Sequence, residues 1–162
     1  MSTIETFAKS YAFYRQRTLS LLDDVEATSD PRAALLWRPA AGHAHLGWQL
    51  MHIGITEDIF ASERLAPRKL GRFRELWPRF RGGSTPDDEV PPPCEIRDLL
   101  SQARQDLLDT LAEYGEDRLA EVPAALSERQ LTVLDVLYIL GWHEAHHHGQ
   151  AHLTLNLYKA AH

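Results

Sequence analysis

Apolar residues recur at helical spacing in four segments of the chain, and proline and glycine are frequent between them. Such a period of about 3.6 residues is typical of helices that bury one face. Local signals support the ends: Ser2 and Glu5 form a capping-box pattern, and Gly115 follows the third segment as a stop. The four segments extend from Ser2 to before Pro31, over about 44–65, over about 95–114, and from Ser127 or Thr132 to about Lys159.

No stretch alternates apolar and polar residues long enough to predict a sheet. The pattern therefore predicts an all-α fold, a four-helix bundle formed by residues 1–162 as a single domain. The link at 37–42 is short, whereas residues 67–93 form a long crossover in which Phe73, Trp77 and Phe80 are expected to pack on the bundle. The difference in length between these two connections favours a connectivity other than simple up-down-up-down. A pair of helical hairpins that assembles as a dimer is the second possibility.

Two histidines occupy the apolar stripe of the last segment. His143 and His147 lie one helical turn apart, in line with Val136, Leu140 and Ala151. A buried imidazole with unpaired polar atoms costs roughly 1–3 kcal/mol for each such atom. Two imidazoles at this spacing can direct one nitrogen each at a single ion, so the pair predicts a metal site. The alternative is two core histidines bonded to backbone or water.

A third ligand is expected from the second segment, where His52 shares a face with Trp48, Ile55 and Ile59. His45, two turns earlier, is expected at the surface or as a helix cap. The other histidines are placed outside the coordination sphere, with His148 at the mouth of the pocket. They are His43, His146, His148, His152 and His162.

Two carboxylates accompany these histidines. Glu57 and Glu144 are candidates to orient the imidazoles, or else solvated helix residues. Because Glu144 directly follows His143, as in helical zinc proteases, a hydrolase with Glu57 or Glu144 as base stays open. Gln150, Trp48 and the 67–93 crossover are further candidates to shape a substrate pocket.

Composition restricts the function classes. Lys and Arg number 17 against 23 Asp and Glu, giving a formal charge of −6, which disfavours nucleic acid as a partner. The single cysteine, Cys94, excludes an internal disulfide and is interpreted as incidental. Because neither a signal peptide nor a membrane-length apolar run is apparent, we expect a cytoplasmic protein without a membrane partner.

The motif residues resemble those of the DinB-like superfamily of four-helix metal proteins. In that superfamily, His-x-x-x-His-Arg-Gly-Gln is typical of the last helix, and the chain has His143-Glu144-Ala145-His146-His147-His148-Gly149-Gln150. The single His of the second helix with an acid five residues later corresponds to His52 and Glu57, and Trp37-Arg38-Pro39 also matches. The chain departs from the pattern at His148, which stands where Arg is usual.

The resemblance implies His52, His143 and His147 as ligands of a divalent ion such as zinc or nickel, and it implies a homodimer. Relatives include thiol S-transferases and a thiol-dependent maleylpyruvate isomerase. Three nitrogen ligands leave a coordination position open, as in catalytic zinc sites. We therefore expect a metal-dependent transferase that uses a low-molecular-weight thiol. The alternatives are a small-molecule hydrolase and a non-catalytic, stress-associated metal-binding dimer.

Overall fold

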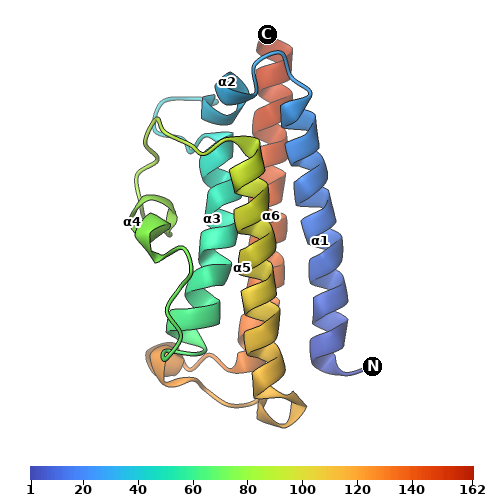
Figure 1. The fold of residues 1–162 in the computed structure, drawn as a ribbon, viewed down its shortest axis with the longest axis vertical. Helices are drawn as coiled ribbons and strands as arrows, with labels where there is room; N and C mark the ends of the chain where they lie inside the picture. The colour runs from blue at the N-terminus through green and yellow to red at the C-terminus, as the bar shows by residue number, and fades with distance from the viewer.

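The computed structural model describes residues 1–162, and all of its regular structure is helical (Figure 1). The all-α prediction is therefore confirmed. Four long helices are present, together with short helices and turns. In chain order they are α1 (Thr3–Glu26), α2 (Pro31–Leu36), α3 (Leu46–Ile59), the π-helical turn η1 (Phe60–Arg64), η2 (Arg74–Leu76), α4 (Trp77–Phe80), α5 (Pro93–Tyr114), η3 (Glu116–Arg118), η4 (Ala124–Arg129) and α6 (Val133–Ala161).

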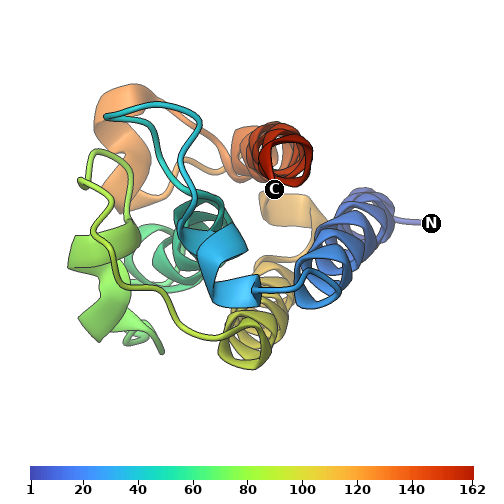
Figure 2. The same cartoon turned by 90° about the horizontal axis from the view of Figure 1, so that it is seen from above.

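The four long helices form a bundle with the expected non-simple connectivity. Helices α1 and α6 run in one direction, and α3 and α5 run in the other (Figure 1). Each helix packs on two neighbours, so that α3 lies diagonally across from α1 (Figure 2). The long crossover between α3 and α5 returns the chain to the end of the bundle where α3 began.

Local sequence signals set the helix ends. Ser2 and Glu5 form a complete capping box on α1, and Thr132 with Asp135 does the same on α6. Helix α5 ends at Gly115, whose φ of 74° lies in the left-handed region that glycine adopts without strain. Two short helices were not predicted: α2 lies between the first predicted helix and the 37–42 link, and α4 lies within the 67–93 crossover.

Helix α3 is buried on nearly every side, which explains why its apolar residues do not keep to one face. It packs on α5 and α6 within the bundle, and α2 and α4 cover it from outside (Figure 2). Its last turn widens to a π-helix, with the Leu65 amide donating to the Phe60 carbonyl at 3.0 Å. Such wide turns are frequent at functional sites because they redirect side chains.

The carboxylate of Asp58 fastens the crossover to α3. It is buried and accepts hydrogen bonds from the amides of Arg72 and Phe73 at 2.9 and 3.0 Å, and from the Trp77 indole at 2.8 Å. Trp77 and Phe80 are buried against the bundle, as expected, while Phe73 is partly buried. The crossover is thus an ordered part of the structure.

A layer of buried charges divides the apolar core into two clusters. Each long helix contributes one residue, namely Arg15, Glu57, Arg104 and Glu144. The larger cluster lies between the halves of the long helices near α2. The smaller cluster lies between the halves at the opposite end of the bundle. No helix is both long and apolar enough to cross a membrane.

Candidate metal centre

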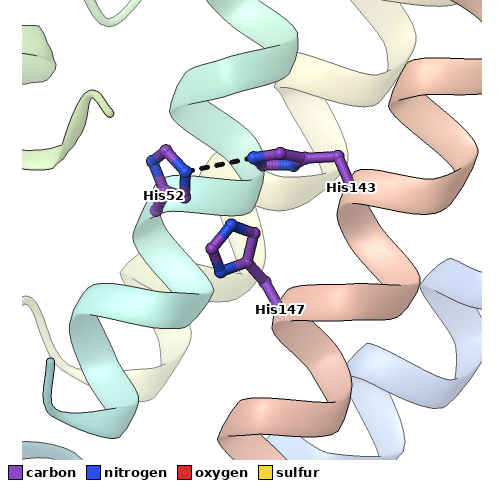
Figure 3. A group of neighbouring side chains, drawn as sticks. All are labelled: His52, His143 and His147. Atoms are coloured by element: carbon purple, nitrogen blue, oxygen red, sulfur yellow. Dashed lines mark hydrogen bonds between the residues drawn. The ribbon is translucent and has the colours of Figure 1, made fainter. Parts of the chain in front are cut away.

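The three histidines singled out from the sequence come together between α3 and α6. One nitrogen from each of His52, His143 and His147 lies within 4.8 Å of the others. The ring centroids are 4.5 to 4.8 Å apart, and Figure 3 shows the three rings gathered between the two helices. The helical turn between His143 and His147 places both rings on the face of α6 that is directed toward α3. The prediction that His143 and His147 share one face of the last helix is therefore confirmed, and their role as metal ligands stays a prediction.

Neighbouring oxygens fix the tautomers of two rings. His52 Nδ1 donates to the Phe80 carbonyl at 2.7 Å, so its Nε2 presents a lone pair toward His143. His147 Nδ1 donates to the amide oxygen of Gln49 at 2.5 Å, and its other nitrogen is directed toward His52 and His143 (Figure 3). Oxygen acceptors of this kind usually orient imidazoles that ligate a metal.

The Nε2 atoms of His52 and His143 are 3.0 Å apart. Since Nε2 of His52 is an acceptor, Nε2 of His143 donates the proton in the metal-free protein. If Nε2 of His143 bound a metal ion, this proton would move to Nδ1 of the same ring. Two nitrogens on one tetrahedral zinc ion are separated by roughly 3.3 Å, given bonds of about 2.0–2.1 Å. The observed separation fits this arrangement with only a small adjustment.

The surroundings keep the rings uncharged. Burial lowers the pKa of His143 to about 3, and repulsion from the charged forms of His147 and His52 contributes. Burial also lowers the pKa of His147 to about 4, again with repulsion from His52 and His146. The pKa of His52 is lowered mainly by burial. Neutral imidazole is the form that binds a metal.

The donor set therefore fits a divalent transition-metal ion. Three neutral nitrogens are preferred by zinc, nickel and copper over the hard ions magnesium and calcium. Trp48 stacks on His52 with ring centroids 4.5 Å apart and also meets the His147 ring edge-on at 6.4 Å. His52 is 6% exposed, His143 and His147 are half-buried, and one side of the cluster borders a hollow in the protein.

That side is a cavity of about 460 Å³ in contact with His52 and His143. Its size is within the range of small-molecule sites. The wall comes from α3 and η1, from the crossover, and from the η4 segment with the start of α6. The lining residues are His52, Thr56, Ile59, Phe60, Arg64, Arg81, Gly82, Ala125, Leu126, Glu128, Arg129, Leu131, Ile139 and His143.

The two candidate carboxylates do not orient the imidazoles. Glu57 accepts from Arg15 at 2.9 Å and from Arg104 at 3.0 Å, and Glu144 accepts from Arg15 at 2.8 Å and from Thr18 at 2.9 Å. Burial alone would raise the pKa of Glu144, but the adjacent guanidinium groups hold it below its usual value. Carboxylates paired in this way are not available as general bases, so both candidate roles are wrong. The alternative of solvated helix residues is also wrong, because both side chains are buried.

His148 also differs from its expected place at the pocket mouth. One residue beyond His147, a helix turns by about 100°, and the ring points toward α1. There it lines a separate small hollow with Arg17 and Asp24.

The remaining predictions about single residues are partly confirmed and partly wrong. His45 caps α3 by accepting from the Trp48 amide, although it is buried rather than at the surface. Gln150 contacts the exposed His146 and lies outside the cavity, and Trp48 supports His52 instead of lining the cavity. The crossover contributes Arg81 and Gly82 to the cavity as expected. His43, His146, His152 and His162 are exposed, and so is Cys94.

Three features of the site were missed from the sequence. Gln49 lies three residues before His52, one turn along the same helix, and this spacing could have suggested it. The Phe80 carbonyl and Arg81 come from the crossover, which has no helical periodicity, and Arg64 and Arg129 lie at the ends of predicted helices. No pattern in the sequence indicates their position.

Comparison with known families supports the same interpretation. The family model for the DinB superfamily matches residues 11–151, which includes all three histidines and all four long helices in whole or in large part. No curated protein and no solved structure matched the chain. On the strength of this match and of the helical bundle, the chain belongs to the DinB superfamily.

Proposed function

We propose that His52, His143 and His147 bind one divalent metal ion, zinc or nickel, and that the protein uses it as a metal-dependent thiol S-transferase. The convergence of three neutral ring nitrogens beside a cavity is the observation that carries this proposal. Structural zinc sites are normally closed by four protein ligands, whereas a site with three ligands leaves room for a substrate.

A bound ion would supply positive charge that lowers the pKa of a thiol beside it and so favours the nucleophilic thiolate. The side chains and backbone of the protein would supply the other requirements of the reaction. Gln49 and the Phe80 carbonyl hold the rings in orientation, and the apolar wall at Phe60, Leu126 and Ile139 excludes water from the reacting groups. In a test reaction with 1-chloro-2,4-dinitrobenzene, a carbon–sulfur bond forms, chloride leaves, and the thiol proton passes to water.

Hydrolysis is the weaker candidate because Glu57 and Glu144, its two candidate bases, are paired with arginines. A non-catalytic metal-binding dimer is the other rival. Homodimer formation itself is a prediction from family resemblance, and light scattering on the purified protein measures it directly.

The test uses protein purified without an affinity tag. Metal content and thiol consumption are measured with a panel of low-molecular-weight thiols for the unaltered protein, His143→Ala and His146→Ala. His146 is the matched control because it lies on the same helix but is exposed and outside the cavity. We expect His143→Ala alone to lose metal and activity. Unchanged metal content in His143→Ala would remove the proposed site, and full metal content without thiol consumption would favour the non-catalytic rival.

A further inference from the structure

The cavity beside the candidate metal centre carries an unusual concentration of positive charge. Three arginines line it, Arg64, Arg81 and Arg129, against one carboxylate, Glu128. The chain as a whole has a formal charge of −6. The net charge of the residues that line the cavity is therefore positive, whereas the net charge of the whole chain is negative. Folding of a helical bundle does not require such a cluster of positive charge.

These arginines are also poorly matched with acids. Arg81 and Arg129 make no ion pair, and Arg64 contacts only its neighbour Glu63 at 3.2 Å. Five of the nine other arginines outside the buried layer are paired with acids. Examples are Arg72 with Asp106, Arg79 with Asp87, and Arg97 with Asp23 and Glu26. The cavity thus leaves three guanidinium groups available to a ligand.

The three side chains come from separate parts of the chain. Arg64 is the last residue of the π-helical turn η1, Arg81 follows α4 in the crossover, and Arg129 ends η4. Arg81 stands directly after Phe80, whose carbonyl orients His52, and directly before Gly82, which also lines the cavity. The segment that positions one imidazole therefore also delivers a positive charge beside it.

Guanidinium groups bind carboxylates and phosphates through pairs of parallel hydrogen bonds. The positive charge and the planar shape of the guanidinium match the charge and the oxygen positions of the anion. The rest of the wall is largely apolar and includes Ile59, Phe60, Leu126, Leu131 and Ile139. A ligand that satisfies both parts has an apolar body and an acidic group.

We propose that the substrate bound in this cavity is a small organic anion whose carboxylate or phosphate is recognised by Arg64, Arg81 and Arg129. Its apolar body lies along the hydrophobic wall, and its reactive end faces His52 and His143. This inference rests on the proposed function for the identity of the reaction, but binding of the anion depends on the arginines and can be measured separately.

The experiment measures binding by isothermal titration calorimetry with three probes. Phthalate presents carboxylates, phenyl phosphate presents a phosphate, and dimethyl phthalate is a neutral compound of similar shape. Each is titrated into the full-length protein in metal-loaded and metal-free form. We expect at least one anion to bind more tightly than the neutral ester, and we expect higher salt to weaken that binding because exposed charges are screened. The anion that binds identifies the acidic group.

Arg81→Gln and Arg129→Gln should each weaken anion binding by roughly tenfold, in line with the loss of one charged hydrogen bond. Arg68→Gln is the matched control, since Arg68 is exposed, unpaired and outside the cavity. Metal content of every variant is recorded. Anion binding that persists without metal and falls in the cavity variants alone supports the proposal even if no thiol chemistry is found. Equal binding of anions and neutral ester, or equal loss in Arg68→Gln, overturns it.

Discussion

Gln49 and the Phe80 carbonyl determine which nitrogen of two imidazoles is free to bind an ion. Each accepts from Nδ1, of His147 and His52 respectively, and leaves the other nitrogen facing the cluster. A backbone carbonyl cannot be removed by substitution, but the glutamine can. The orientation of His147 is therefore the feature of the centre most directly open to experiment.

Gln49→Leu is expected to weaken metal binding by roughly 10–100-fold without unfolding the bundle, because the ring of His147 loses its oriented acceptor. Competition with a chelator of known affinity measures the change. Gln105→Leu is the control, since Gln105 is exposed on α5 and contacts Asp109 instead of a histidine. Equal metal affinity in Gln49→Leu and the unaltered protein would show that the ring is held by packing alone.

The depressed pKa values of the histidines predict how stability depends on pH. The pKa of His143 is lowered to about 3 and that of His147 to about 4, whereas an unfolded chain has a His pKa of about 6.5. The unfolded state thus binds more protons between these values. The free energy of unfolding of the metal-free protein should fall as pH decreases from about 6.5 toward 4, by up to about 1.4 kcal/mol per pH unit for each proton.

Urea denaturation of metal-free protein at several pH values measures this slope. The slope should be smaller in His143→Gln, which removes one of the buried rings, and unchanged in His43→Gln, because His43 is exposed and lies outside the cluster. A stability that stays constant between pH 7 and 4.5 would contradict the assignment of neutral buried imidazoles. Acid should also release the ion from loaded protein, because protonated rings cannot bind it.

Among the elements, the crossover has a strict steric requirement at Gly71. A Cβ atom at Gly71 would lie 2.2 Å from Cζ2 of Trp77 and 2.9 Å from the Asp58 carboxylate. Both belong to the contact that fastens the crossover to α3. The position of a Cβ atom is fixed by the backbone, so no side-chain rotation of an alanine at this position can relieve the overlap. Either the indole or the backbone must shift.

Gly71→Ala is therefore expected to lower the melting temperature and to increase cleavage of the crossover in limited proteolysis. Gly149→Ala is the matched control. Its Cβ would meet nothing within 4 Å on an exposed part of α6, and replacing a helical glycine by alanine stabilises by up to about 1 kcal/mol. If Gly71→Ala melts and is cleaved like the unaltered protein, the packing of Trp77 on Gly71 does not hold the crossover.

The elements also show which parts of the structure can be predicted from sequence. Helical periodicity and capping residues are local signals, and they correctly predicted the four long helices and the shared face of His143 and His147. Arg15 and Arg104 could not be predicted as buried, because a charged residue in a helical pattern is normally assigned to solvent. Their burial depends on partners 42 and 47 residues away in the chain. The π-helical turn and the cavity arginines depend likewise on tertiary contacts.

At the scale of the whole molecule, the charged layer connects all four long helices. Glu57 and Glu144 each contact both Arg15 and Arg104, and all four side chains are at most 10% exposed. Removing one member of a buried ion-pair network leaves an uncompensated charge away from water. The network therefore opposes any shift of one helix along its neighbours.

Glu144→Gln is expected to reduce the free energy of unfolding by about 3–5 kcal/mol, because one guanidinium charge is then unbalanced in the core. Chemical denaturation measures the loss. Asp106→Asn, which breaks the exposed pair with Arg72, should change the denaturation midpoint little. A small effect in Glu144→Gln would mean that water or a rearranged arginine reaches the layer.

The ring nitrogens and the guanidinium groups are carried by different kinds of structure. His52, His143 and His147 stand on long helices fixed by the core, whereas Arg64, Arg81 and Arg129 stand in the turn after α3, in the crossover and in η4. Connectors tolerate replacement far better than packed helices do. Exchanging these three arginines alone should therefore alter which compounds the protein accepts, while the long helices and the Phe80 carbonyl that orients His52 stay in place.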